Sequence, residues 1–144
     1  MKTIENGLVA VVKQDCQTCV LIEPVLAQLA ADGVAVYSQD DPGFPASVPR
    51  VLDDRELETS FNLEIETVPT LVRFADGAET GRLVGWVRDE WQDFTGIGDL
   101  GQDLPAFRPG CGSKSVEPGI AEELAVRYGD LAINARRIEV ASLE

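Results

Sequence analysis

The residues of this chain best suited to chemistry are two cysteines three positions apart. Cys16 and Cys19 follow an apolar run at 8–12 and stand at the start of a helical pattern. If a helix begins at Cys16, the two thiols lie one turn apart on the same face, with Cβ atoms roughly 5–6 Å from each other. The N–H groups and dipole of a helix N-terminus favour a thiolate on the first cysteine. The spacing therefore predicts a dithiol/disulfide redox site.

Two other interpretations of this pair remain open. Cysteine behaves as a small hydrophobic residue when buried, so both thiols can serve as core side chains of a redox-inactive protein. Zinc binding is the other alternative, although a four-ligand site normally needs a second Cys/His pair. The chain has no histidine, and Cys111 is its one further cysteine. We therefore expect neither a metal site nor a histidine-assisted nucleophile.

Cys111 lies between glycines that would let its thiol approach the cysteine pair or a partner. Lys114 and Arg108 are expected to lower its pKa. The functional interpretation is a third redox thiol, or a contact for a dedicated partner, and the alternative is a free cysteine in a loop. The segment also resembles a phosphate-binding loop, but Ser113 stands where that pattern needs glycine before Lys114.

Composition and charge exclude several classes of function. The 144 residues include 12 Lys and Arg against 25 Asp and Glu, a net charge of −13. So acidic a surface repels phosphate backbones, and we expect no nucleic-acid partner. No apolar run approaches the roughly 20 residues of a membrane span, and no signal-peptide core follows Met1. We therefore expect a cytoplasmic protein without membrane contact, where thiols are mostly reduced and cysteines serve chemistry.

The pattern around the cysteines predicts an α/β fold. Pro24 should kink the helix that follows them, and Asp76-Gly77 should form a hairpin turn. The order of elements predicts a mixed sheet in which the first three strands are parallel and the hairpin adds an antiparallel strand. Strands are expected at 7–13, 34–37, 71–74 and 80–84, and helices at 19–31, 57–61 and 89–94.

The composition of the chain changes after residue 96. Residues 96–119 are rich in Gly, Pro and Asp, with few periodic apolar residues, and predict a long loop or linker. We therefore expect a domain at 1–96 and a C-terminal extension at 97–144.

The extension is expected to hold one clear helix. The pattern predicts it from Pro118 to Tyr128, with an apolar face that packs against the domain. Residues 131–140 are ambiguous between strand and helix. Trp86 and Trp91, near the last helix of the domain, are expected to cover the core or the extension rather than bind a ligand.

Several motifs in register resemble the thioredoxin family. The cysteine pair follows the first central strand, and a proline lies five residues after the second cysteine. The resemblance covers about residues 5–96. It implies a thioredoxin-like fold, with a central mixed sheet flanked by helices, plus the C-terminal extension, and a cis peptide bond before Pro69 that faces the disulfide. The other matching segments are Val68-Pro69-Thr70-Leu71, Phe74-Ala75-Asp76-Gly77 and Gly85.

The chain departs from the family around the cysteines. Asp-Cys-Gln-Thr-Cys stands where thioredoxins have Trp-Cys-Gly-Pro-Cys. The family's buried aspartate falls at Ala10, and an aromatic residue of the family falls at Val12. Asp15 places negative charge beside Cys16 and should oppose its thiolate. The resemblance therefore implies a redox site with unusual tuning.

The resemblance implies a thiol-disulfide oxidoreductase. Cys16 would attack a disulfide of a protein partner, and Cys19 would resolve the mixed disulfide. Val68 and Pro69 would align the partner chain. No bound cofactor is expected, because electrons pass through the cysteines, and an external reductase would recycle the protein. The alternative is a redox-inactive thioredoxin-like interaction module, as one part of a longer protein.

Overall fold

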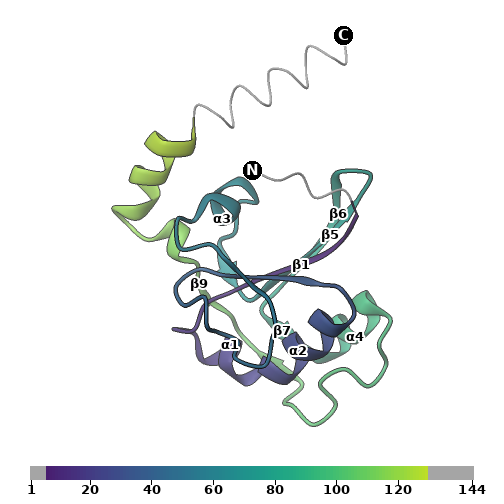
Figure 1. The fold of residues 1–144 in the computed structure, drawn as a ribbon. Helices are drawn as coiled ribbons and strands as arrows, with labels where there is room; N and C mark the ends of the chain where they lie inside the picture. Colours follow the sequence, from purple (N-terminus) through teal and green to yellow (C-terminus); the bar gives the residue numbers. More distant parts are fainter. Residues whose placement is uncertain (1–5, 130–144) are drawn as a thin grey trace.

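A five-stranded mixed sheet organises the computed structural model, which describes residues 6–129 (Figure 1). The strand order is β3-β2-β1-β5-β6. Three strands are parallel to one another, and the other two form an antiparallel hairpin beside them. The parallel strands are β1 (Gly7–Val12), β2 (Ala35–Ser38) and β3 (Val51–Asp53), and the hairpin strands are β5 (Thr70–Ala75) and β6 (Ala78–Val84).

Strand β1 lies at the centre because its side chains are apolar on both faces. Residues 9–12 are at most 1% exposed. Such burial on both sides is typical of a strand that helices cover from above and below. Helices α2 (Glu23–Ala31) and α4 (Arg88–Thr95) lie on one side of the sheet, and α3 (Glu58–Asn62) lies on the other (Figure 1). The prediction of a mixed sheet flanked by helices is confirmed.

The helix that follows β1 is split in two. Helix α1 (Gln17–Leu21) ends at Ile22, and α2 begins at the next residue. Pro24, in the first turn of α2, has no N–H to donate to the preceding turn, so the helical hydrogen bonds break there. The predicted interruption at Pro24 is confirmed, and it leaves a short helix that begins directly after Cys16.

The prediction that the strand at 71–74 runs parallel to the first two is wrong. Strand β5 is antiparallel to β1, and it is preceded by β3, which the sequence pattern does not predict. Helix α3 has five residues and rises about 7.5 Å, whereas a six-residue strand spans about 20 Å. So short a helix cannot carry the chain back along the sheet, and β5 therefore begins where β1 ends.

The hairpin between β5 and β6 turns at Asp76-Gly77, as predicted. Both residues have positive φ, 54° and 81°. Two positive φ angles give the turn the twist that matches the flanking strands, and glycine adopts this region at no steric cost.

The loop or linker predicted at 96–119 is present only in part: residues 96–106 form turns without helix or strand, but the residues that follow pair with the domain. Strand β8 (Phe107–Arg108) pairs antiparallel with β7 (Trp86–Val87), and β9 (Cys111–Gly112) pairs antiparallel with β4 (Thr67–Val68). The chain therefore leaves α4, crosses the domain and returns to the end of the sheet that carries the cysteines. The division into two parts at residue 96 stays a prediction.

Two buried tryptophans hold the returning segment. Trp86 and Trp91 are fully buried, with ring centroids 5.3 Å apart. The indole N–H of Trp86 donates to the carbonyl of Pro105 at 2.8 Å, and that of Trp91 donates to the carbonyl of Gly85 at 2.9 Å. Both tryptophans therefore cover the core, and Trp86 also contacts the extension, in agreement with the sequence prediction.

The expected C-terminal helix is present at 120–129, where the described residues end. The ring of Tyr128 packs on that of Phe61 with centroids 5.9 Å apart, so the helix contacts the domain next to α3. The ambiguous segment at 131–140 lies outside the described residues.

The packing of the returning segment on Trp86 predicts the effect of Gly101→Ala. Gly101 has a φ of +64°, and a Cβ there would lie 2.6 Å from the Trp86 ring. We expect the substitution to lower the free energy of unfolding by about 2–4 kcal/mol, from overpacking and left-handed strain together. Urea unfolding in the presence of a reductant measures this change.

Gly98→Ala is the matched control, because a Cβ at Gly98 meets nothing within 4 Å. This variant should stay within about 0.5 kcal/mol of the unsubstituted protein. Equal losses in the two variants would contradict the packing of the segment on Trp86.

Candidate redox site

Cys16 and Cys19 lie at the end of β1, where α1 begins. Cys16 is the N-cap residue of α1, and its sulfur accepts a hydrogen bond from the backbone N–H of Cys19 at 3.3 Å. Both thiols are free, with 4% of Cys16 and none of Cys19 exposed. The structure thus places the two cysteines one turn apart, as their spacing predicts.

The loop that leads into Cys16 is fixed by Asp40. The backbone N–H groups of Gln14 and Asp15 donate to the Asp40 carboxylate at 2.8 and 3.0 Å. Partial burial would raise the pKa of Asp40, but these backbone hydrogen bonds lower it overall. Sequence reasoning missed this residue. Its position just after β2, at the end of the sheet where β1 also ends, is the signal that could have identified it.

The segment before Pro69 forms the wall opposite Cys16. The Cys16 sulfur lies 3.7 Å from the carbonyl oxygen of Val68. Val68 and Pro69 are buried, and the peptide bond between them is cis. The structure therefore brings both residues expected to align a partner chain to the side of Cys16.

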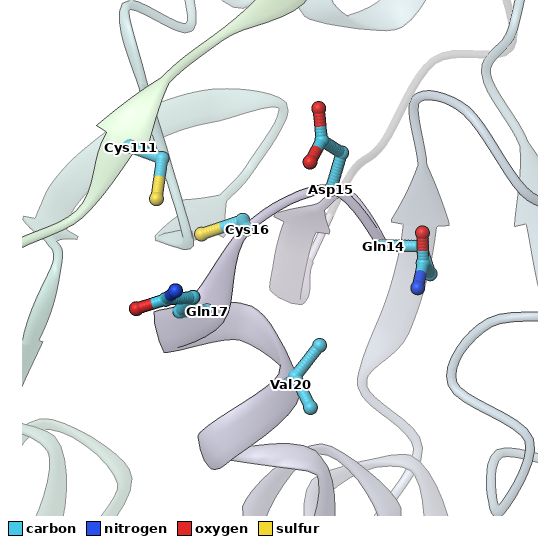
Figure 2. A pocket seen from close by; sticks show the side chains of 6 residues that line it. All are labelled: Gln14, Asp15, Cys16, Gln17, Val20 and Cys111. Carbon is cyan, nitrogen blue, oxygen red and sulfur yellow. The ribbon is translucent and has the colours of Figure 1, made fainter.

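Cys111 completes a group of three thiols. It lies directly opposite Val68 in the pairing of β9 with β4. Figure 2 shows the sulfurs of Cys111 and Cys16 directed toward each other. Cys111 is partly exposed, whereas Cys16 is almost fully covered. The structure thus places Cys111 beside Cys16, and its role as a third redox thiol stays a prediction.

Two side chains next to the cysteines hold the segment that carries Cys111. The Lys13 ammonium donates to the carbonyl of Gly112 at 2.7 Å, and the Thr18 hydroxyl donates to the carbonyl of Pro109 at 2.6 Å. Thr18 is the residue directly before Cys19, where thioredoxins have proline. This departure from the family pattern is the signal that sequence reasoning noted without finding its partner.

A buried hydrogen-bond network anchors the residues that follow Cys111. The Gln39 side chain is 1% exposed and donates to the hydroxyls of Ser60 at 2.8 Å and Ser113 at 2.7 Å. Its carbonyl oxygen accepts from the backbone N–H of Lys114 at 3.0 Å. The residues that resemble a phosphate loop in the sequence therefore fasten the segment to the core.

Hydrogen bonds make Cys16 acidic. The bond from the Cys19 thiol, together with those from the Cys111 thiol and the backbone N–H groups of Cys19 and Thr18, lowers the pKa of Cys16 to about 5 against the opposing effect of burial. Cys16 is therefore a thiolate at neutral pH. The net direction is opposite to the one expected from Asp15, whose carboxylate and the Cys16 sulfur extend in different directions (Figure 2).

The pKa values of the other two thiols, Cys19 and Cys111, are raised. Burial raises the pKa of Cys19 far above the usual range of a thiol, and the hydrogen bond to Cys16 and the negative charge of Cys16 act in the same direction. Burial and the same two effects of Cys16 raise the pKa of Cys111, and the charge of Lys13 acts against them. The expectation that Lys114 and Arg108 lower the pKa of Cys111 is therefore wrong in direction.

An open pocket of about 450 Å³ lies outside the thiols (Figure 2). Another molecule can approach the sulfurs from this side. The residues that line the pocket are Gln14, Asp15, Cys16, Gln17, Val20 and Cys111. Within residues 6–129, no group of three or more His, Cys, Asp or Glu side chains is arranged to hold a metal ion. None of the helices in that range is long and apolar enough to cross a membrane.

Comparison with solved structures supports the fold. An uncharacterized conserved protein from Geobacillus kaustophilus aligns with a TM-score of 0.50 and 15% identity, over 73% of this chain and 74% of its own. The central mixed sheet flanked by helices is the one that the sequence resemblance implied. The chain has a thioredoxin-like fold. No family model matches it.

Two thioredoxins align with this thioredoxin-like chain at lower TM-scores. Thioredoxin (Mala s 13) of Malassezia sympodialis is 23% identical, with a TM-score of 0.45 over 68% of this chain and 78% of its own. Thioredoxin O1 of Arabidopsis thaliana in its oxidized state is 24% identical, with a TM-score of 0.40 over 69% and 78%. The chemistry therefore has to be argued from this chain's own thiols.

The hydrogen bonds at Cys16 predict its titration. In the reduced protein, the ultraviolet absorbance of the thiolate should appear as pH rises through about 5. Cys111→Ala should move this transition to higher pH, because it removes one thiol donor, and Cys16→Ser should abolish it. A transition near the ordinary thiol range in the unsubstituted protein would contradict the assignment of these donors.

Proposed function

We propose that the protein is a thiol-disulfide oxidoreductase, with Cys16 as the nucleophile and Cys19 as the resolving thiol. The observation that carries this proposal is the placement of Cys16 at the N-cap of α1, one helical turn from Cys19, whose backbone N–H donates to the Cys16 sulfur. Hydrogen bonds there lower the pKa of Cys16, and burial raises that of Cys19. At neutral pH, Cys16 is ionised and Cys19 keeps its proton. Disulfide exchange requires this division, because the thiolate is the attacking species.

The reaction would pass through a mixed disulfide with a protein partner. The Cys16 thiolate attacks one sulfur of the partner disulfide, and the other sulfur leaves as a thiolate. Cys16 then carries no charge, so its contribution to the raised pKa of Cys19 disappears. Cys19 gives up its proton and attacks Cys16, which forms the Cys16–Cys19 disulfide and releases the second partner thiol. Val68 and Pro69 would align the partner beside Cys16.

The acidity of Cys16 sets the expected direction of electron flow. A low pKa stabilises the reduced, ionised state, and this makes the corresponding disulfide a stronger oxidant. We expect a reduction potential above the value of about −270 mV known for thioredoxin. The pair would then accept electrons readily from partner dithiols in the oxidised state. In that direction the partner dithiol itself returns the pair to the dithiol state. After the pair has reduced a partner disulfide, an external reductase would return it to the dithiol in a reducing cytoplasm, with no bound cofactor.

One observation favours a second candidate, the redox-inactive interaction module. Cys16 is only 4% exposed, because the segment that carries Cys111 lies across it. In this alternative the two cysteines are packing residues beneath the segment and never form a bridge.

Equilibration of the reduced protein with glutathione buffers of graded potential tests the proposal. We expect two thiols to disappear together and reversibly, with the Cys16–Cys19 disulfide inside the tryptic peptide 14–50. The same protein should accelerate the reduction of insulin by dithiothreitol, and Cys16→Ser should return this rate to background. If no bridge forms at any potential used, the interaction module replaces the enzyme.

A further inference from the structure

The position that a partner sulfur must reach in this reaction is already occupied. Cys16 lies 3.7 Å from the carbonyl of Val68, so an incoming sulfur has to lie next to Val68. In the structure, the residue next to Val68 is Cys111, which pairs with Val68 between β9 and β4. Its sulfur is directed at Cys16 (Figure 2). The chain thus presents one of its own thiols to Cys16 in the way that an added β-strand presents a side chain.

The placement of this strand is built into the surrounding residues. A Cβ at Gly110 would lie 2.4 Å from Thr67 Cγ2 and 2.6 Å from the Val68 carbonyl oxygen, so only glycine allows this approach. Lys13 and Thr18 fix the carbonyls on the two sides of Cys111. The register that sets Cys111 opposite Val68 is therefore fixed by contacts both before and after the cysteine.

We propose that residues 110–112 are a built-in partner strand, and that Cys111 exchanges disulfides with Cys16 and is the thiol at which other molecules react with this protein. The proposal rests on the redox function of Cys16 and Cys19, and it moves the mixed disulfide with the partner from Cys16 to Cys111. The partner is a dithiol or disulfide that enters the pocket beside Cys111.

The internal step needs neither an oxidant nor a reductant. Starting from the Cys16–Cys19 disulfide, the Cys111 thiol loses its proton and its sulfur attacks the Cys16 sulfur. Attack falls on Cys16, because Cys111 is directed at Cys16 whereas Cys19 is fully buried (Figure 2). The Cys16–Cys111 bond forms as the Cys16–Cys19 bond breaks, and Cys19 leaves and takes up a proton. One disulfide and one thiol are present before and after, so the disulfide moves from a buried pair to a partly exposed one.

The outward step follows from leaving-group chemistry. A partner thiolate can attack either sulfur of the Cys16–Cys111 disulfide, and the sulfur of lower pKa leaves faster. Cys16 is that sulfur, and Cys111 is the more exposed of the two. Attack therefore falls on Cys111 and yields a Cys111–partner disulfide and the Cys16 thiolate. A second partner thiol then displaces Cys111, and the partner dithiol has become a disulfide at the expense of the Cys16/Cys19 pair.

The Cys19→Ser variant tests the internal bond directly, because it leaves Cys16 and Cys111 as the only thiols. Oxidised glutathione serves as the oxidant. We expect a Cys16–Cys111 disulfide, seen by mass spectrometry as a link between tryptic peptides 14–50 and 89–114. Glutathione that remains on either cysteine, without this link, would overturn the proposal.

Two glycines that flank Cys111 give a matched pair in the same variant. Gly110→Ala should lower the equilibrium constant for the Cys16–Cys111 disulfide, measured against glutathione, by about tenfold or more. When the strand is not docked, Cys111 is held near Cys16 only by the flexible chain, and its effective concentration there is lower. Gly112→Ala should leave it unchanged, since a Cβ there meets nothing within 4 Å. Equal effects of the two substitutions would overturn the role of the strand.

The unsubstituted chain separates this inference from the proposed function. If it forms the Cys16–Cys19 disulfide and Cys19→Ser forms no Cys16–Cys111 disulfide, only the inference fails. If it forms no Cys16–Cys19 disulfide, the proposed function fails. Gly110→Ala in a chain that keeps Cys19 should still form the Cys16–Cys19 disulfide and should unfold cooperatively in urea, and the cooperative transition shows that the domain remains folded.

The site of exchange has its own measurement. A short pulse of reduced glutathione on the Cys16–Cys111 form of Cys19→Ser, stopped with acid, should leave glutathione on Cys111 in peptide 89–114. First adducts on Cys16 in peptide 14–50 would show that partners do not react at Cys111.

Discussion

The pairing of β9 with β4 is the constraint on which the site depends. It brings Cys111, from the far end of the chain, to the thiol at the start of α1. The approach requires a glycine at position 110 and is held by Lys13 and Thr18, which flank the cysteine motif. Buried polar groups without partners are costly, so the hydrogen bonds between Gln39 and Ser113 stabilise one docked arrangement over others. Lys13 and Thr18, beside and within the cysteine motif, thus hold the segment that carries Cys111.

Three thiols share one negative charge at this site. Hydrogen bonds to a charged group contribute about 1.5–3 kcal/mol each, more than bonds between neutral groups. Cys16 receives such bonds from both other thiols, so it carries the charge while Cys19 and Cys111 keep their protons. Groups coupled this strongly titrate and react as a unit. In the Cys16–Cys111 disulfide, the stability of the Cys16 thiolate makes Cys16 the preferred leaving group and directs an incoming thiolate to Cys111.

Features that depend on neighbouring residues could be predicted from the sequence. The apolar run of β1, the break at Pro24 and the turn at Asp76-Gly77 follow from local patterns, and the structure has all three. The direction of β5 could not be predicted in this way, because it depends on the end of the sheet that the chain reaches after β3, a three-residue strand that the local pattern does not indicate.

The pairing of residues 107–113 with the domain could not be predicted from the sequence either, because it depends on residues far apart in the chain. Glycines around Cys111 suggest flexibility, but Gly110 is needed for close approach to a strand more than forty positions earlier in the chain. The contacts that fasten the segment pair Thr18 with Pro109 and Lys13 with Gly112, and no local pattern reveals such pairs.

Native-state hydrogen exchange at Ser113, whose backbone N–H donates to the carbonyl of Glu66 at 3.0 Å, tests the docking most directly. Docking predicts that this amide exchanges within about tenfold of the rate at Gln39, whose amide bonds to Val12 in the core. Exchange at the rate of an unprotected amide would contradict it.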